Sequence, residues 1–555
     1  MITKKNTCTI IKGEESGNIH PDSGKTIIIS SGAIVGNDAG NYGVFFEGIK
    51  DGTGKVINNG TIKSNWESNI ITDDSKIASI INNGSIITNN RSNIKITNNS
   101  IAELISNTVS IHSMQRAMEL NNSKINTLNN YGKIFGNWSS VSMSNSSIEN
   151  FHNAGAIQSG NNKSYVTIEV KDKSFINNIV NEGEISGFNV FNFNNSSAKS
   201  FKNKKTISGK NAIELNGSTI YDFYNIGTIT ADNNVFNILN SNINTLNNSG
   251  NIINKHKTNS ALNLSNSSVK TLTNSEFGIL SGGSGLILNK STIENFTNQG
   301  MIKNTNNNNN TVEINNSSID QFNNSGTING TKRAVSFNSA KINKFSNLGL
   351  LNSINYGIRS EKNGYIKNIL YNSGTIMGGL GGISLEQQFH LGTLTNAGSI
   401  IGTGSVSNGI NIDSTSKVDS IISTSSNALI AGVNAGINNE GTIGKDDASN
   451  AITLKQGTIT ASQNNRQINT AGNALINNGT IQGNIFLTDN AKIIGTLKNT
   501  KTITGSIELN SNSQINTISN AGTINKDIKL NQSTIANINN AGTITNGINL
   551  SNKML

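Results

Sequence analysis

The sequence is poor in several residue types that shape ordinary globular domains. Its 555 residues include one proline, one cysteine and 5% aromatic residues. No apolar run is long enough to cross a membrane as a helix. Because Cys8 is the only cysteine, no disulfide can form within the chain. Pro21 lies near the N-terminus, and the lack of proline beyond it fits uninterrupted strands, since proline cannot donate to a hydrogen-bond ladder.

The two ends of the chain also lack expected features. The N-terminal residues include a basic stretch but no apolar core of about 7–15 residues, which a secretory signal needs. The chain ends at Leu555 inside a repeat, without the polar capping segment that keeps a solenoid soluble. Together the two ends predict a piece of a longer protein.

Asparagine, glycine and one repeated phrase are abundant. Asparagine makes up roughly a fifth of the residues, and there are 55 glycines. The phrase Ile-x-x-Leu-x-Asn-x-Gly-x-Ile recurs with small changes, for example at Ile243–Ile252, Ile319–Ile328 and Ile515–Ile524. Neighbouring copies are mostly 20 to 28 residues apart, and in two wider gaps Lys205 and Glu276 take the place of the glycine. A fixed period in this range is typical of a solenoid.

One copy shows how a single coil is expected to fold. In Asn211–Asp232, apolar residues alternate on a first strand, Ile220 and Phe223 point inward from a second strand, and Ile229 lies on a third. The spacing of three between Ile220 and Phe223 indicates a bend between them. Asn and Gly at the corners tolerate the left-handed conformation that tight turns need. This coil therefore predicts three strands and three corners.

Stacking such coils predicts an all-β fold, a right-handed parallel β-helix of roughly 20 coils with about 20–28 residues each. Asparagines at equivalent corners would form amide ladders, and a structural role is expected for Asn225, Asn248 and Asn324. The expected organisation has four parts: an atypical leading segment (1–50), regular repeats (51–398), irregular repeats with loops around the polar stretch Gln463–Gln467 (399–480), and regular, truncated repeats (481–555).

The formal net charge of +10 comes from scattered lysines, with the densest group at Lys199–Lys205. A solvated, solubilising face is the first interpretation, and a patch for anionic polysaccharide or nucleic acid is the second. No aromatic residues interleave with these lysines in the way that single-stranded nucleic acid requires. No nucleic-acid partner is therefore expected.

Reactive constellations are scarce. The five histidines do not pair with cysteines or acids at metal-ligand spacing, and His152 is expected on the outer surface. The adjacent acids Asp73–Asp74 and Asp446–Asp447 fall in turns, and no groove is expected in which acids from three or four consecutive rungs line up. We therefore expect no catalytic, cofactor or metal site, and no enzyme.

One pattern predicts a modification. Glu-x-Asn-x-Ser occurs at Glu119–Ser123, Glu214–Ser218 and Glu313–Ser317, and it resembles the extended acceptor of some bacterial N-glycosylation systems. The candidate acceptors are Asn121, Asn216 and Asn315. The alternative is that an asparagine-rich repeat generates Asn-x-Ser by chance.

The repeated phrase, over about residues 50–550, resembles the passenger domains of bacterial autotransporters, particularly the asparagine-rich type of Campylobacter and Helicobacter relatives. The resemblance implies a β-helical rod that is exported through a C-terminal β-barrel in the outer membrane and displayed at the cell surface. It also implies adhesion to a host-cell surface or to an extracellular glycan or protein. This sequence lacks both a recognisable signal peptide and the barrel, and the family motif carries no catalytic residue.

Three functions follow as hypotheses. The first is a non-enzymatic surface adhesin or host-interaction protein. The second is a β-helix polysaccharide lyase or hydrolase. The third is an inactive structural fragment of a longer autotransporter.

Overall fold

The computed structural model describes residues 2–4, 6–36, 42–462 and 468–551, so the polar stretch Gln463–Gln467 lies outside the described residues. The described chain is all-β, with parallel strands stacked into a β-solenoid of about 21 turns, which confirms the predicted fold class. No helix in this part of the chain has the length and apolar character to span a membrane. The chain divides into two compact units, Met1–Val269 and Lys270–Leu555, which we call unit 1 and unit 2.

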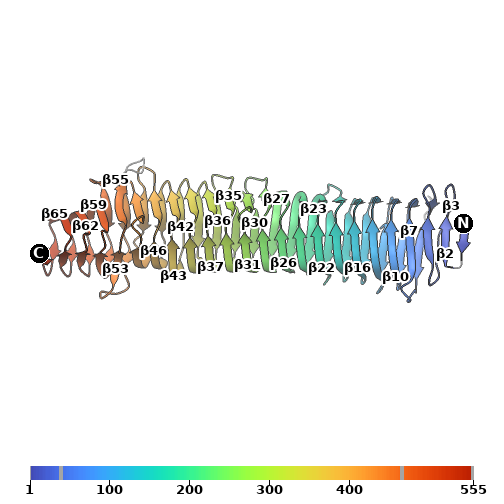
Figure 1. Ribbon diagram of the computed structural model, residues 1–555, viewed down its shortest axis with the longest axis horizontal. Coiled ribbons are helices and arrows are strands. Elements are labelled where there is room, and N and C mark those ends of the chain that lie inside the picture. The colour runs from blue at the N-terminus through green and yellow to red at the C-terminus, as the bar shows by residue number, and fades with distance from the viewer. Residues whose placement is uncertain (1, 5, 37–41, 463–467, 552–555) are drawn as a thin grey trace. The chain divides into compact units, whose positions relative to one another are not determined.

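Unit 1 is built from three columns of parallel strands, with one strand of each column in most rungs (Figure 1). Column A forms one sheet, and columns B and C belong to a second sheet. The antiparallel strand β1 (Ile2–Lys4) pairs with the first strand of column A. Column A contains β2 (Thr7–Ile10), β4 (Thr26–Ile29), β7 (Gly54–Asn58), β10 (Lys76–Asn82), β13 (Ile101–Asn107), β16 (Lys124–Asn130), β19 (Ser147–Asn153), β22 (Phe175–Asn181), β24 (Ser197–Asn203), β26 (Thr219–Asn225) and β28 (Asn242–Asn248).

Columns B and C follow each column A strand in turn. Column B contains β5 (Ile34–Val35), β8 (Thr61–Ser64), β11 (Ser85–Thr88), β14 (Ser110–Ser113), β17 (Lys133–Gly136), β20 (Ala156–Ser159) and β29 (Asn251–Asn254). Column C contains β6 (Val44–Glu47), β9 (Ile70–Asp73), β12 (Ile94–Thr97), β15 (Arg116–Asn121), β18 (Ser139–Ser144), β21 (Val166–Lys171) and β30 (Leu262–Ser265).

Three rungs of unit 1 differ from the predicted coil. Columns B and C run together there as the single strands β23 (Glu184–Asn194), β25 (Thr206–Asn216) and β27 (Thr228–Leu239). The third corner expected in Asn211–Asp232 is therefore absent, because Ile229 continues directly into the next strand. The β25–β27 pairing shifts register between Gly209 and Asn211.

The predicted bend within column A strands is confirmed. In β26, Ile220 and Phe223 are both buried, while the two residues between them, Tyr221 and Asp222, lie on the outer side. The inward residues stack on their counterparts in adjacent rungs. The rings of Phe201 and Phe223, for example, lie 4.9 Å apart between centroids. Stacking like on like fills the lumen with close-packed apolar side chains.

The last residue of most column A strands is a buried asparagine, and these side chains form a ladder along unit 1. Each Nδ2 donates to the Oδ1 of the next asparagine at 2.7–2.8 Å. The ladder comprises Asn58, Asn82, Asn107, Asn130, Asn153, Asn181, Asn203, Asn225 and Asn248. The structural role predicted for Asn225 and Asn248 is confirmed, and both are fully buried.

Most ladder asparagines are followed two positions later by the repeat glycine, and at Gly155 space requires it, whereas Val109 and Lys205 take this slot after Asn107 and Asn203. A Cβ built on Gly155 would lie 2.0 Å from the carbonyl oxygen of Gly132, its counterpart on the previous rung. Neither glycine has a positive φ, so the left-handed conformation expected here is not the reason for glycine. That conformation occurs instead at the corner between columns C and A, for example at Asn122 and Asn145.

Unit 2 repeats the three-column plan. Column A contains β34 (Thr292–Asn298), β37 (Ser318–Asn324), β40 (Lys341–Asn347), β43 (Gly364–Asn372), β46 (Phe389–Asn396) and β49 (Lys417–Ser423). Column B contains β32 (Ile279–Gly282), β35 (Met301–Asn304), β38 (Thr327–Gly330), β41 (Leu350–Ser353), β44 (Thr375–Gly378), β47 (Ser399–Gly402), β50 (Leu429–Gly432) and β54 (Thr458–Ser462). Column C contains β33 (Leu286–Asn289), β36 (Asn310–Asn315), β39 (Arg333–Asn338), β42 (Tyr356–Ser360), β45 (Gly381–Leu385), β48 (Asn408–Ile412), β51 (Ala435–Asn439) and β56 (Asn473–Asn477).

The asparagine ladder of unit 2 changes column partway along. Its first part, which includes the predicted Asn324, ends column A strands from Asn274 to Asn396. The next column A strand ends at Ser423, and the ladder resumes at the end of column C from Asn439 to Asn540. The rungs just before this point contain 24 or 25 residues each, so two rungs would need about 49 residues. The step from Asn396 to Asn439 is only 43 residues. The next copy of the phrase therefore reaches column C instead of column A.

The rungs after this change have a different corner pattern. Strand β59 (Lys492–Asn499) pairs with both β54 and β56, so columns B and C merge. Column A is divided into pairs of short strands, such as β57 (Thr480–Ile481) with β58 (Asn484–Leu487). The segment boundaries at residues 50, 398 and 480 stay predictions.

One slot in the repeat was assigned wrongly from sequence. In unit 2 the ladder asparagine Asn274 donates to the carbonyl oxygen of Gly278 at 3.1 Å, the same contact that Asn298 makes with Gly300. Gly278 thus takes the glycine position that was given to Glu276. A two-residue turn, closed by a hydrogen bond from Gly278 N to Ser275 O at 2.8 Å, displaces it.

Replacing one ladder asparagine should loosen the rungs around it. Asn130 accepts from Asn107 Nδ2 at 2.8 Å and donates to Asn153 Oδ1 at 2.7 Å and Gly132 O at 3.1 Å. Asn130→Ala leaves these buried groups without partners, at a cost of about 1–3 kcal/mol. Since each rung contacts only its neighbours, the effect should be local. Hydrogen exchange should show amides of β13, β16 and β19 exchanging roughly ten- to a hundredfold faster.

Asn129, on the outer side of the same strand, provides the matched control. Asn129→Ala should leave exchange in these strands within about twofold, because surface changes of this kind are usually small. Equal protection in Asn130→Ala and the wild type would contradict a structural role for the ladder.

Candidate functional site

The three predicted glycosylation acceptors occupy equivalent places at the ends of column C strands. Asn121 and Asn216 are exposed, whereas Asn315 is half-buried and its Nδ2 donates to Glu313 Oε1 at 2.8 Å. In each case the serine two residues later is buried in the corner and donates to the carbonyl of the asparagine, at 2.9 Å for Ser123 and Asn121. The structure does not bring the three asparagines together on one rung, and their glycosylation stays a prediction.

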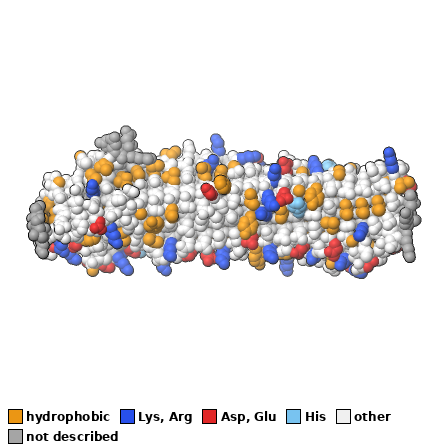
Figure 2. Space-filling model, viewed as in Figure 1, with side chains coloured by type: hydrophobic (Ala, Val, Ile, Leu, Met, Phe, Trp, Pro, Cys, Tyr) orange, Lys and Arg blue, Asp and Glu red, His pale blue; other side chains and the backbone are white. Residues whose placement is uncertain are grey.

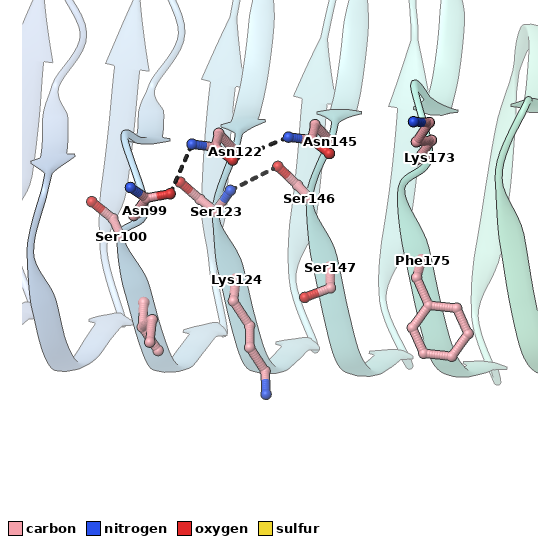
Figure 3. A pocket seen from close by; sticks show the side chains of 11 residues that line it. Asn99, Ser100, Asn122, Ser123, Lys124, Asn145, Ser146, Ser147, Lys173 and Phe175 are labelled. Carbon is pink, nitrogen blue, oxygen red and sulfur yellow. Dashed lines mark hydrogen bonds between the residues drawn. The ribbon is translucent and has the colours of Figure 1, made fainter.

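The corner that follows Asn121 is hollowed into a shallow groove of about 390 Å³ (Figure 3). Asn99, Asn122 and Asn145 lie on successive rungs along it, joined by amide hydrogen bonds of 2.8 and 3.1 Å. Lys173 takes the asparagine position on the next rung, and Phe175 lies beyond it. The floor is polar, because Ser123 N–H donates to Ser146 Oγ at 3.1 Å. These groups satisfy one another, so the groove is mainly a structural corner.

A second hollow in unit 1, the Trp138 cleft, combines aromatic and charged side chains. It has a volume of about 310 Å³ and is lined by Arg116, Trp138, Ser139, Ser164, Tyr165, Val166 and Glu169. Trp138 is 41% exposed, and the guanidinium carbon of Arg116 lies 5.8 Å from its ring centroid. Glu169 accepts from Ser142 Oγ at 2.7 Å and pairs with Lys171 at 3.3 Å. The cleft thus offers an apolar ring, a cation and a carboxylate to a ligand.

Rung stacking aligns a third aromatic residue with the two that line this cleft. Three consecutive rungs each have an aromatic residue at the start of column C. Trp138 and Tyr165 come directly before β18 and β21, and Phe188 lies in β23. The N–H of Val166 donates to Trp138 O at 3.1 Å, and that of Asn189 donates to Tyr165 O at 3.3 Å. Sequence reasoning missed this row, because its members lie 8, 12 and 7 residues after their ladder asparagines. Loops of unequal length hide a repeat that the strands restore.

Each of three histidines pairs with one carboxylate of the adjacent rung, although no such pairing is visible in the sequence. The pairs are His20–Glu47 at 3.4 Å, His152–Glu182 at 3.0 Å and His390–Asp419 at 2.9 Å. Lys204 also binds Glu182, and hydrogen bonds from Lys204 and His152 lower the pKa of Glu182 to about 2. His152 is on the outer surface, as predicted. Within the described ranges, no three His, Cys, Asp or Glu residues form a group that could hold a metal ion.

Acids do line up on consecutive rungs in unit 2, which the sequence did not reveal, while the expectation of no acid-lined groove stays a prediction. Glu361, Glu386, Asp413 and Glu440 each follow a column C strand on four successive rungs. The backbone N–H of Asp413 bonds to Leu385 O at 3.0 Å, and that of Glu440 bonds to Ile412 O at 2.9 Å. Sequence separations of 25, 27 and 27 residues conceal this acid row.

The members of the acid row are engaged with neighbouring groups. Glu361 pairs with the buried Arg333, and Glu386 pairs with Arg359 at 2.7 Å while accepting from Ser384 Oγ at 2.8 Å. Burial acts to raise the pKa of Asp413, but hydrogen bonds from Gln387 N–H, Ser416 and Thr415 outweigh it, so this pKa lies below its usual value. A general acid needs the opposite shift. The predicted acid pairs are elsewhere, with Asp74 at a corner after β9 and Asp446–Asp447 in the loop between β52 (Thr442–Ile443) and β53 (Asn450–Leu454).

Glycosylation should occur first at the exposed acceptors. We expect the protein from its native host to be heavier than its sequence mass, and the added mass to fall in Asn121→Gln and Asn216→Gln. Ser123→Ala keeps Asn121 but removes the hydroxyl of its acceptor motif and serves as the control. An unshifted intact mass in the wild-type protein would end this prediction.

Comparison of the chain with protein-family models, with curated proteins and with solved structures gives no match. The fold described above is therefore the basis on which a function is proposed.

Proposed function

We propose that this chain is a non-enzymatic β-solenoid of the autotransporter-passenger type, displayed at the cell surface and adhesive to a host-cell surface or an extracellular glycan or protein. Outer-membrane attachment would come from a β-barrel elsewhere in the full-length precursor. The resemblance of the repeated phrase supports this family, and the parallel solenoid with asparagine ladders is compatible with it.

The observation that carries the adhesive part is the Trp138 cleft. Inward positions of every rung are committed to the core and the ladder, so recognition depends on outward side chains. Large aromatic side chains are costly to leave in water, and Trp138 remains 41% exposed beside a cationic Arg116. A tryptophan with a polar rim is typical of the anchors that dominate binding energy at interfaces.

Beads coated with the purified chain should adhere to cultured epithelial cells, and Trp138→Ala with Tyr165→Ala should reduce adhesion about thirtyfold or more. Loss of one aromatic anchor usually costs about 2 kcal/mol or more of binding energy. Phe277→Ala is the matched control, since Phe277 is 80% exposed in unit 2 and lies outside the cleft. Adhesion no higher than that of albumin-coated beads would favour the inert structural fragment instead. Antibody labelling of intact cells tests surface display.

The acid row supports a second candidate function, a polysaccharide lyase or hydrolase. Such enzymes need carboxylates from neighbouring rungs near one substrate bond. Two observations count against an enzyme. Glu361 and Glu386 are paired with arginines, and the pKa of Asp413 is lowered. We expect no new reducing ends when the chain is incubated with polygalacturonate or host-type glycans. Release that is lost in Glu386→Gln and retained in Asp73→Asn would replace the adhesin proposal with the enzyme.

A further inference from the structure

The outer surface of column A in unit 1 carries lysines and tyrosines side by side. Lys202 on β24 pairs in register with Tyr224 on β26 and, on its other side, with Val180 on β22. Tyr221 lies between residues that pair with Ala198 and Ser200, which places it beside Lys199. We call the surface formed by Lys199, Lys202, Lys204, Lys205, Tyr221, Tyr224 and Ile226 the Lys–Tyr face. Figure 2 shows basic and apolar side chains together on this side of the solenoid.

This arrangement places two tyrosines beside Lys199–Lys205, which the local sequence does not show. Along the chain the lysines and tyrosines are separated by about one rung, with Lys202 and Tyr224 22 residues apart. Parallel stacking brings successive rungs to within about 4.8 Å of each other. The interleaving is therefore a property of the solenoid and not of the local sequence.

The face has excess positive charge. Glu182 and Asp222 are two carboxylates beside it, and Glu182 already binds Lys204 and His152. In the described part of the chain, Lys199, Lys202 and Lys205 have no carboxylate within 4.0 Å. Asp222 lies on β26 in register with Ser200 of β24. It is therefore adjacent to Tyr221 in its own strand and close to Lys199 on the neighbouring strand. Three cations thus remain available to an anionic ligand, and the nearby acids are Asp222 and Glu184, which is in register with Thr206 beside Lys205.

The apolar part of the face is exposed and lines a hollow. Tyr221 is 53% exposed and Ile226 is 52% exposed. A groove of about 330 Å³ lies between the rungs and is lined by Ser200, Lys202, Tyr224, Asn225, Ile226, Asn247 and Ser249. The hydroxyl groups of Ser200 and Ser249 can exchange hydrogen bonds with a polar ligand, while Tyr224 and Ile226 offer an apolar contact.

We infer that the Lys–Tyr face binds an acidic polysaccharide, through lysine contacts to its carboxylate or sulfate groups and packing of its sugar rings on Tyr221 and Tyr224. A sugar ring presents an apolar C–H face to an aromatic ring and hydroxyls at its edge, which matches tyrosines flanked by Ser and Asn. A nucleic acid fits less well. It carries a charge on every nucleotide and stacks on aromatics along a whole channel, whereas the tyrosines here occupy a single rung.

This inference is independent of the adhesive function, because the acidic polysaccharide could belong to a host or to the cell that makes the protein. It also uses a surface separate from the Trp138 cleft. A failure of bead adhesion would therefore leave it standing, and its own failure would leave the adhesin proposal standing.

Binding of the full chain is measured against immobilised polygalacturonate, dextran sulfate, neutral dextran and oligo-dT, at low and high salt. We expect binding to one or both acidic polysaccharides and none to neutral dextran, with weakening as salt screens the lysines. Lys199→Gln, Lys202→Gln and Lys205→Gln together should weaken binding about tenfold at low salt. Tyr221→Ala with Tyr224→Ala should weaken it about as much, and that loss should persist at high salt.

A matched variant separates this face from bulk charge. Lys341→Gln, Lys344→Gln and Lys362→Gln together remove the same charge from exposed positions in unit 2 and should change binding less than twofold. The inference would be overturned by an equal loss of binding in both triple variants, or by unchanged binding in the variant with Lys199→Gln, Lys202→Gln and Lys205→Gln. Tighter binding to oligo-dT than to either acidic polysaccharide would also overturn it. Strand content measured by circular dichroism confirms that the variants remain folded.

Discussion

The hydrogen bond between buried asparagine amides of adjacent rungs is the interaction on which the rest of this structure depends. Each ladder asparagine also binds backbone carbonyls at its corner, as Asn130 does with Gly132. It therefore fixes both the turn between two columns and the register of one rung on the next. Unpaired, such groups would each cost about 1–3 kcal/mol. Paired from rung to rung, they hold together a core of stacked Ile, Leu, Val and Phe side chains.

The ladder imposes a second constraint, on space. Rungs that stack at strand distance bring the turn backbones into contact, and a Cβ on Gly155 would overlap the carbonyl of Gly132. Asn-x-Gly thus combines an amide that links two rungs with a glycine that, in most rungs, leaves room for the neighbouring turn backbone. Outward positions have no such restriction. They can carry lysine, tyrosine, tryptophan or glutamate without disturbing the fold, and this freedom is where function can reside.

Function in this architecture depends on combining residues that are one rung apart. The Trp138 cleft, the Lys–Tyr face and the acid row each consist of residues separated by 20 to 30 positions in sequence and placed side by side by strand pairing. The acid row also shows why alignment of groups does not by itself make a catalytic site. Glu386 and Glu361 are held by Arg359 and Arg333, so their charges are already compensated.

The sequence by itself determined the all-β solenoid, the inward Ile and Phe positions, the bend between Ile220 and Phe223, and the structural asparagines, because these depend on a short periodic phrase. It could not determine the fused strands such as β27, the displacement of Gly278, or the change of the ladder from column A to column C after Asn396. Those depend on how loop lengths add up over whole rungs. Tertiary structure alone decided which outward residues meet, since loops of unequal length conceal the register that interstrand hydrogen bonds impose.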